Sequence, residues 1–329
     1  MKKILNHLFE NKSFSRLEAR KILTSIAQGE YNNAQIAAFI TAYGMRNITV
    51  HELAGFRDAM LDLCIPLSFS DFELIDLCGT GGDGKDTFNI STLASFVVAG
   101  TGNKVAKHGN YGVSSGCGSS NVMEYLGHRF TNDQDILKRN LDQAGICFIH
   151  APLFNPAMKT VAPIRKELGV KTFFNMLGPM CNPAQPKNQL VGVFSLELAR
   201  LYGYLYQETD KNYTILHALD GFDEVSLTCD FKTFSKKGES LRKVSDLGFE
   251  QLNEMDIKGG DTVESSATIF RNILNAEGTD AQHNVVLCNA ALAIQTIKPD
   301  LSFADCFYEA EESLMGKKAL KAFTTLINN

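Results

Sequence analysis

The sequence predicts an α/β fold in which a small N-terminal helical domain precedes a larger α/β domain with a mostly parallel central sheet and flanking helices. Apolar residues recur at helix spacing, without strand signals, through about residue 67, and short apolar strands then alternate with helices. A chain of 329 residues is long enough for two unequal domains. We therefore expect a helical domain at 1–67 and an α/β domain at 68–329.

The helical domain is predicted from two runs of apolar residues spaced as on one face of a helix. Ser15 stands three residues before Glu18, the spacing of a capping box at a helix start. Pro66 ends the helical pattern. The two runs are Leu17, Ile22, Leu23 and Ile26, followed by Ile36, Phe39, Ile40 and Tyr43.

The α/β domain begins with the apolar strand 74–78, which runs directly into glycines. The apolar segment 284–297 is predicted to be a helix of the core. Further strands are expected at 104–106, 146–149, 190–194, 213–216 and 225–227.

Composition excludes several classes of protein. Hydrophobic residues make up 44% and charged residues 21%, as in soluble globular proteins, and the net charge of −5 argues against a general nucleic-acid binder. No apolar run approaches the roughly 20 residues that span a bilayer. We therefore expect no membrane contact. The eight cysteines form no C-x-x-C pair, so we also expect no structural zinc and a reducing, cytoplasmic location.

The glycine loop at 79–87 fits two nucleotide-binding patterns imperfectly. A phosphate-binding NTPase loop needs Ser or Thr after the lysine, but Asp86 follows Lys85. A dinucleotide fingerprint needs an acidic residue about 20 positions on, but no Asp or Glu stands between Thr87 and Met123. This acid-free stretch, rich in glycine, hydroxyl groups and a few cations, suits a ligand that carries phosphate at more than one point.

Several short motifs follow one another along the chain: GTGGD at 79–83, NIST at 89–92, KHGN at 107–110, NPAM at 155–158, RKELG at 165–169, FNMLGP at 174–179, NPA at 182–184 and DGFDE at 220–224. In this order and spacing they resemble the anthranilate phosphoribosyltransferase family, among the nucleoside phosphorylase-like glycosyltransferases. The resemblance covers nearly the whole chain. It implies transfer of the phosphoribosyl group of 5-phosphoribosyl 1-pyrophosphate (PRPP) to the amine of anthranilate, in tryptophan biosynthesis.

The same resemblance implies the site residues. Catalytic roles fall to Lys107, Arg165 and Asp83, and anthranilate would contact Gly79, Asn110 and Arg165. PRPP would be bound by Gly79, Gly82, Asp83, Thr87, Asn89, Ile90, Ser91, Thr92, Lys107, His108, Gly109, Asn110, Ser114, Ser115 and Ser119. A contribution of residues from about 165–180 to the helical domain and a homodimer are also implied.

An acidic pair, Asp223 and Glu224, follows the predicted strand at 213–216. Hard oxygen ligands suit Mg²⁺, which a pyrophosphate substrate requires. We therefore expect Mg²⁺ at Asp223 and Glu224, and the family resemblance implies Ser91 as a further ligand.

The chain departs from the family pattern in the phosphate loop. Tyr111 and Gly112 replace the usual Arg and Ala, and Gly116 replaces a frequent Lys, while Cys117 and Asn121 replace Ser and Asp. Two cations are therefore missing from this loop. Lys85, Lys104 or Arg129 are candidates to compensate for them.

Two alternatives stay open from the sequence. A pyrimidine-nucleoside phosphorylase shares the architecture and a similar glycine loop but would not need the acidic pair. A catalytically lapsed relative that binds nucleic acid would explain the two missing cations.

Overall fold

The computed structural model describes residues 1–112 and 117–329, which form two compact units. The first unit comprises Met1–Leu67 and Ala151–Gln185, and the second comprises Ser68–His150 and Pro186–Asn329. The second segment of the helical unit therefore comprises residues 151–185, whereas the sequence indicated a contribution from about 165–180. No helix in the described part of the chain is long and apolar enough to cross a bilayer.

The first unit is entirely helical among the residues described. Ser15 caps its second helix: the Ser15 side chain accepts a hydrogen bond from the Glu18 N–H, and the Glu18 side chain accepts one from the Ser15 N–H. This confirms the predicted capping box. The elements are α1 (Lys2–Phe9), α2 (Arg16–Ala27), α3 (Asn33–Gly44), α4 (Val50–Leu63), α8 (Ala151–Phe154), α9 (Met158–Leu168) and the short 3-10 helices η1 (Phe173–Met176) and η2 (Gly178–Met180).

A cluster of aromatic rings joins the two segments of this unit. Phe56 of α4 stacks on Phe173 of η1 with ring centroids 4.7 Å apart, and Phe39 of α3 meets both rings edge-on. All three side chains are buried. Burial of such rings stabilises the unit and explains why residues after Ala151 pack with the N-terminal helices.

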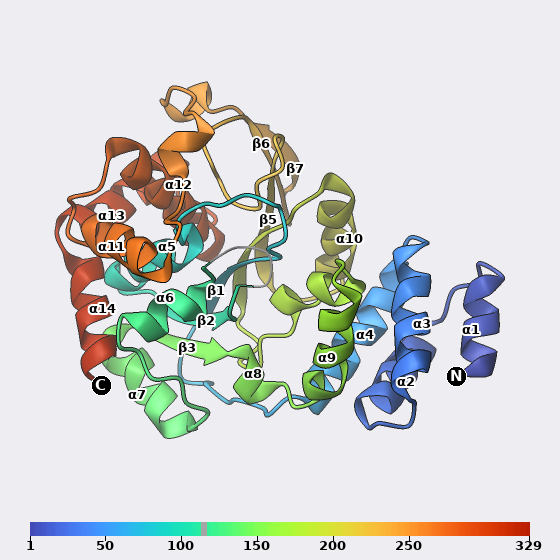
Figure 1. The fold of residues 1–329 in the computed structure, drawn as a ribbon. Helices are drawn as coiled ribbons and strands as arrows, with labels where there is room; N and C mark the ends of the chain where they lie inside the picture. The colour runs from blue at the N-terminus through green and yellow to red at the C-terminus, as the bar shows by residue number, and fades with distance from the viewer. Residues whose placement is uncertain (113–116) are drawn as a thin grey trace. The chain divides into compact units, whose positions relative to one another are not determined.

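The second unit is built on a seven-stranded sheet of order β3-β2-β1-β4-β5-β6-β7 (Figure 1). The first five strands in this order are parallel, and the last two are antiparallel. This confirms the predicted α/β class with a mostly parallel sheet. The strands are β1 (Leu74–Gly79), β2 (Lys104–Gly109), β3 (Ile146–His150), β4 (Asn188–Gly192), β5 (Asn212–Ala218), β6 (Phe231–Ser235) and β7 (Gly238–Arg242).

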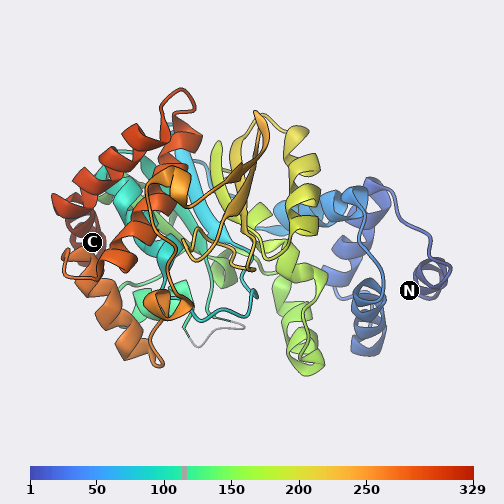
Figure 2. The same ribbon diagram turned by 90° about the horizontal axis from the view of Figure 1, so that it is seen from above.

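Helices cover both faces of this sheet. The orange and red C-terminal helices gather on one face with α5, while α10 lies on the other (Figure 2). The apolar helix α12 packs against α5, α13, β4 and β5, as expected for a core element. The helices are α5 (Ile90–Gly100), α6 (Ser119–Tyr125), α7 (Gln134–Ala144), α10 (Leu196–Gln207), α11 (Val263–Leu274), α12 (Asp280–Ile297), α13 (Phe303–Met315) and α14 (Lys318–Asn328), with η3 (Ser245–Leu247) and η4 (Glu254–Ile257).

The strand order reverses between β1 and β4. From β1 the chain proceeds through α5 to β2 on one side, and from β4 it proceeds through α10 to β5 on the other. Right-handed crossovers then place α5 and α10 on opposite faces. In open parallel sheets, ligands bind at the carboxyl ends of the strands at such a reversal. We therefore expect a ligand site at the loops that follow β1 and β4.

One predicted strand is wrong. Val225–Leu227 is a loop, although its alternation of apolar and polar residues resembles a strand. Asn289 of α12 donates to the Val225 carbonyl and accepts from the Val225 N–H, so a side chain satisfies the backbone groups that a neighbouring strand would otherwise satisfy. Leu227 also has a φ of 58°, outside the β region.

Candidate functional site

The glycine loop follows β1 and turns in the left-handed backbone region. Gly81, Gly82 and Gly84 have φ values of 61°, 73° and 77°, which glycine adopts without the penalty that a side chain brings. The Thr80 N–H donates to the carbonyl of Gly192, the last residue of β4, at 3.0 Å. The loop therefore stands at the reversal point between β1 and β4.

The acidic pair lies against this loop. The Gly81 N–H donates to Oδ2 of Asp223 at 2.7 Å, and the N–H of Ser91, in the first turn of α5, donates to Oε1 of Glu224 at 2.9 Å. Asp223 is buried. The structure thus brings together Ser91, Asp223 and Glu224, the three residues predicted to hold a metal, from segments far apart in the sequence.

Two glycines make room for Asp223. A Cβ atom on Gly79 would lie 3.0 Å from Cγ of Asp223 and would collide with its carboxylate. A Cβ atom on Gly192 would overlap the Asp223 backbone. Gly79 and Gly192 are register partners at the ends of β1 and β4. Asp223 consequently lies over the ends of both strands, with its carboxylate at Gly79 and its backbone at Gly192. Gly192 was not among the predicted site residues, and its strand-end position is the only signal for it in the sequence.

Both carboxyl groups titrate well above their ordinary range. Burial, and then the charge of Asp83, raises the pKa of Asp223 to about 7. Burial, and then the charge of Asp223, raises the pKa of Glu224 to about 8. Two acids that repel each other in a desolvated position favour a compensating cation.

On the β2 side, Lys107 is buried, and its ammonium group donates to the Leu77 carbonyl at 2.7 Å. Burial lowers the pKa of Lys107, and the nearby Asp76 opposes this effect. Asp76 also accepts a 3.1 Å hydrogen bond from the His108 N–H. Asp76 is therefore a supporting residue that the sequence analysis missed, and its signal was a lone carboxylate inside an apolar strand.

The segment after β2 folds back onto the start of α6. Ser119 Oγ donates to the Asn110 carbonyl at 3.3 Å, and a Cβ on Gly109 would lie 2.8 Å from that Oγ. Gly109, Asn110 and Ser119, all predicted PRPP contacts, thus lie together. The predicted contacts Ser114 and Ser115, and the replacement Gly116, lie outside the described residues.

Asn121, one of the departures from the family pattern, has a clear structural role. Its Oδ1 accepts hydrogen bonds from the N–H groups of Gly112 and Gly118, both at 3.0 Å. Either Asn or Asp supplies an oxygen at this position. Tyr111 contacts Glu124 through its hydroxyl group at 3.4 Å and meets the His150 ring edge-on.

The remaining predicted PRPP residues form the entry to α5. Thr87, Asn89, Ile90 and Thr92 lie within or directly before its first turn, and the Asn89 side chain donates to the Cys117 carbonyl rather than capping the helix. The hydroxyl groups of Thr80 and Thr92 are buried and have no hydrogen-bond partner among the described residues. Buried polar atoms of this kind mark places where a ligand supplies the missing partner.

The three cations proposed to compensate for the missing Arg and Lys differ in position. Lys85 lies on the glycine loop, where it pairs with Glu254 and stands over the Phe222 ring. Lys104 begins β2 and donates to the carbonyl groups of Leu141 and Asp142. Compensation by Lys104 is wrong, because the phosphate loop follows the opposite end of this strand. Arg129 is exposed in the loop after α6.

Arg165 belongs to the first unit. It lies on α9, donates to Oδ1 of Asn175 at 3.3 Å and stands 5.3 Å over the Phe174 ring. Burial lowers its pKa. Asn110 belongs to the second unit, so the pairing of Arg165 and Asn110 on one substrate stays a prediction.

The residues present fit Mg²⁺. Within residues 1–112 and 117–329, no group of three or more His, Cys, Asp and Glu side chains is placed to hold a metal ion. Mg²⁺, however, is commonly held by one or two carboxylates, with substrate phosphates and water completing its shell. Two desolvated carboxyl groups with raised pKa values beside a phosphate-type loop match that arrangement.

Comparison with known proteins decides the family. The helical bundle domain of the glycosyl transferase family matches residues 2–64, and the a/b domain of that family matches residues 71–320. An anthranilate phosphoribosyltransferase of Flavobacterium psychrophilum is 61% identical over 326 residues, 99% of this chain and 98% of the relative. The chain belongs to the anthranilate phosphoribosyltransferase family.

Solved anthranilate phosphoribosyltransferases share its fold. The crystal structure from Thermus thermophilus has a TM-score of 0.92 at 29% identity, covering 99% of this chain and 98% of that one. The Saccharomyces cerevisiae structure, solved in complex with PRPP and Mg, has a TM-score of 0.91 at 24% identity, covering 99% and 96%. Membership in this family favours the transferase over the phosphorylase and nucleic-acid-binding alternatives.

Proposed function

We propose that this chain transfers the phosphoribosyl group of PRPP to the amine of anthranilate, producing N-(5-phosphoribosyl)anthranilate and pyrophosphate in tryptophan biosynthesis. The observation that carries the proposal is the acidic pair held against the glycine loop, through Gly81–Asp223 and Ser91–Glu224, at the reversal of the strand order. This arrangement occurs in a chain 61% identical to an anthranilate phosphoribosyltransferase.

The glycine loop and the start of α5 would bind PRPP. Gly79, Gly82 and Asp83 would shape the turn around the pyrophosphate, and the unpartnered hydroxyl groups of Thr80 and Thr92 would donate to phosphate oxygens. The N–H groups of Thr80 and Gly81 instead hold the loop against the Gly192 carbonyl and the Asp223 carboxylate. The N-terminus of α5 adds the favourable end of a helix dipole. Asn110, Ser119 and the predicted contacts Ser114 and Ser115 would complete the binding segment from the β2 side.

Asp223, Glu224 and Ser91 would hold Mg²⁺. A bound Mg²⁺ supplies positive charge to the pyrophosphate oxygens as the leaving group departs. Asp83 lies close enough to raise the pKa of Asp223, so it adds to the negative field that selects a cation at this position.

The reaction needs charge stabilisation more than a strong base. The C1–O bond of PRPP breaks, the electron pair leaves with pyrophosphate, and the anthranilate nitrogen bonds to C1 and then releases a proton. Lys107 donates to the Leu77 carbonyl within β1, and its ammonium group would favour the departing anion through its positive charge. The aniline nitrogen is nucleophilic without deprotonation, so the proposal requires no protein base.

Anthranilate would be bound by Arg165, Asn110 and Gly79. The Arg165 guanidinium is partly buried, and within the first unit it meets an amide oxygen and an aromatic face. A carboxylate is the natural counter-ion for such a group.

Anthranilate fluorescence tests the reaction. Purified protein, Mg²⁺, PRPP and anthranilate should together cause a loss of fluorescence that omission of any one component abolishes. The double variant Asp223→Asn with Glu224→Gln should remove the activity, and the exposed control Asp210→Asn should retain it. Full activity in the double variant would contradict the metal assignment, and no activity in the wild-type protein would contradict the proposed acceptor.

We also propose a homodimer and a cytoplasmic location, both of which follow from the family resemblance. Sedimentation equilibrium of the full chain tests the first, with a mass of about twice the 36.2 kDa of one chain as the expected result. Cell fractionation tests the second.

A further inference from the structure

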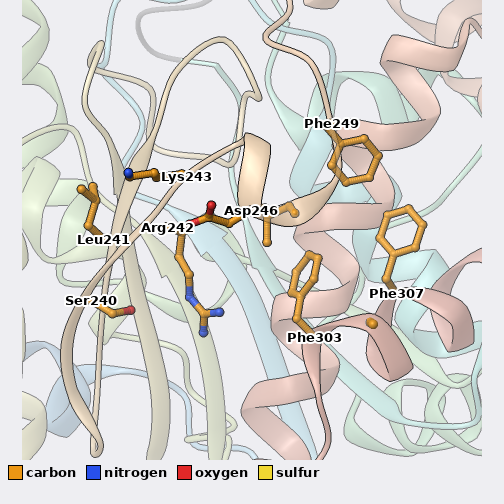
Figure 3. Close-up of a pocket in the computed structure, with 10 residues that line it drawn as sticks. Ser240, Leu241, Arg242, Lys243, Asp246, Phe249, Phe303 and Phe307 are labelled. Atoms are coloured by element: carbon orange, nitrogen blue, oxygen red, sulfur yellow. The ribbon is translucent and has the colours of Figure 1, made fainter.

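A cavity of about 620 Å³ lies in the second unit between strand β7, the short helix η3 and helix α13 (Figure 3). None of its residues belongs to the site described above. Its volume is within the range of roughly 300–1,000 Å³ typical of small-molecule sites. The residues that line it are Ser240, Leu241, Arg242, Lys243, Asp246, Leu247, Phe249, Phe303, Ala304 and Phe307.

One part of the cavity wall is aromatic. Phe249 and Phe307 have ring centroids 5.5 Å apart, and Phe303 and Phe307 have centroids 6.3 Å apart. Figure 3 shows these three rings grouped on one side, across from the β7 side chains. A planar ring inserted here would gain apolar burial and ring contacts.

The β7 side of the cavity carries an unpaired cation. Nε of Arg242 is buried and has no hydrogen-bond partner among the described residues, and no ion pair is formed there by the Arg242 guanidinium. The terminal amino groups of Arg242, which lines the cavity, also form no hydrogen bond or ion pair among the described residues, so a carboxylate can bind them in a bidentate fashion. The cavity therefore has a specific place for a carboxylate beside its aromatic wall.

An acidic group completes the set. Asp246, in η3, lines the same cavity, and its carboxylate forms no ion pair or hydrogen bond among the residues described. The turn that carries it is held in place, since the Val244 N–H donates to Asp230 at 3.0 Å. Asp246 would repel a polyphosphate or dicarboxylate but would accept an ammonium group.

We propose that this cavity binds a zwitterionic aromatic amino acid. Arg242 binds the α-carboxylate, Asp246 accepts from the α-ammonium group, and Phe249, Phe303 and Phe307 surround the ring. This assignment gives Arg242 and Asp246 the partners that they lack among the described residues, and it does not depend on the phosphoribosyl transfer proposed above.

L-Tryptophan is a suitable probe, because the chain contains no tryptophan and the fluorescence anisotropy of the probe then reports binding directly. The full-length protein is titrated into L-tryptophan, into tryptophanamide, which lacks the carboxylate, and into indole-3-propionate, which lacks the ammonium group. We expect L-tryptophan to bind at least about tenfold more tightly than either analogue, as the loss of one charged hydrogen bond implies.

Two variants assign the two charges. Arg242→Gln should lower the affinity for L-tryptophan about tenfold and leave the affinity for tryptophanamide unchanged. Asp246→Asn should lower the affinity for L-tryptophan by a similar factor and leave the affinity for indole-3-propionate unchanged. Arg271→Gln and Asp300→Asn change exposed residues of the same types elsewhere in the unit and should alter nothing. A misfolded variant would lose all three ligands together, so the pattern across ligands separates misfolding from loss of recognition.

The proposal is overturned if L-tryptophan does not bind, or if Arg242→Gln leaves its affinity unchanged. It is also overturned if Arg165→Gln abolishes binding while both cavity variants retain it, because the probe would then occupy the anthranilate site. Equal affinity for the three ligands would mean binding by the aromatic wall alone and would contradict the roles of Arg242 and Asp246.

Discussion

The backbone N–H of Gly81 donates a 2.7 Å hydrogen bond to Oδ2 of Asp223, which stands 142 residues later in the chain. Through this bond the phosphate-type loop and the acidic pair become one site. Desolvation at this position raises the pKa of the carboxyl group to about 7. The contact therefore assembles the site and partly stabilises the carboxylate, whereas burial and the charge of Asp83 leave the site in need of a cation.

Gly79→Ala should lower kcat/KM by about 100-fold, because the new methyl group would displace the Asp223 carboxylate and a shift of about 1 Å in such a site has effects of this size. Gly203→Ala makes the same chemical change in α10, where a Cβ meets nothing within 4 Å, and should leave activity intact. Steady-state kinetics of the two variants test this. Equal kinetics in both would show that the carboxylate position is not required.

Asp223→Asn should stabilise the metal-free fold while removing activity. The folded protein keeps protons on Asp223 and Glu224 up to about pH 7 and 8, whereas the ordinary pKa values are 3.8 and 4.5. The folded state therefore binds more protons than the unfolded state between these values, and its stability falls as the pH rises through that window. At pH 8 without Mg²⁺, the variant should gain about 1–2 kcal/mol in the free energy of unfolding.

Urea unfolding at pH 8, with and without Mg²⁺, measures this gain. Asp210→Asn, an exposed change of the same type, should show none. If Asp223→Asn were less stable than the wild-type protein without metal, burial of the Asp223 carboxylate would not lower the stability of the metal-free fold, and this prediction would be wrong.

Asn121→Ala should raise the KM for PRPP about tenfold with a smaller effect on kcat, since it leaves the N–H groups of Gly112 and Gly118 without their acceptor. Asn121→Asp should restore the KM, because the carboxylate offers the same oxygen. If the Asp variant were as defective as the Ala variant, the acceptor role would be wrong.

His128 should make the fold sensitive to acid. Burial among Phe130 and Phe148 lowers the pKa of His128 from 6.5 to about 4. The unfolded state then binds the proton first, so stability falls as the pH drops from 6.5 toward 4, by at most about 3 kcal/mol. Unfolding free energies measured at pH 7 and pH 4.5 should differ less in His128→Leu than in the wild-type protein. An identical difference in the two proteins would assign the acid sensitivity to other groups.

The sequence by itself determined the fold class, the capping box at Ser15 and the order of the motifs. These features depend on local chemistry: apolar periodicity, a side chain that caps its own helix, and glycines in a loop that follows an apolar strand. The same local reasoning failed at Val225–Leu227, where a distant amide, Asn289, satisfies the backbone and no strand partner exists among the described residues.

Only the tertiary structure decided how the site is assembled. The crossover to β4 places Gly192 beside Gly79, and this juxtaposition leaves space for Asp223 over both strand ends. Asp76 and Lys107 became a supporting pair only once β1 and β2 lay side by side, and the unpaired Arg242 became visible only with its cavity. Burial and pKa depend on neighbours that are remote in the chain, so the periodicity of a sequence carries little information about them.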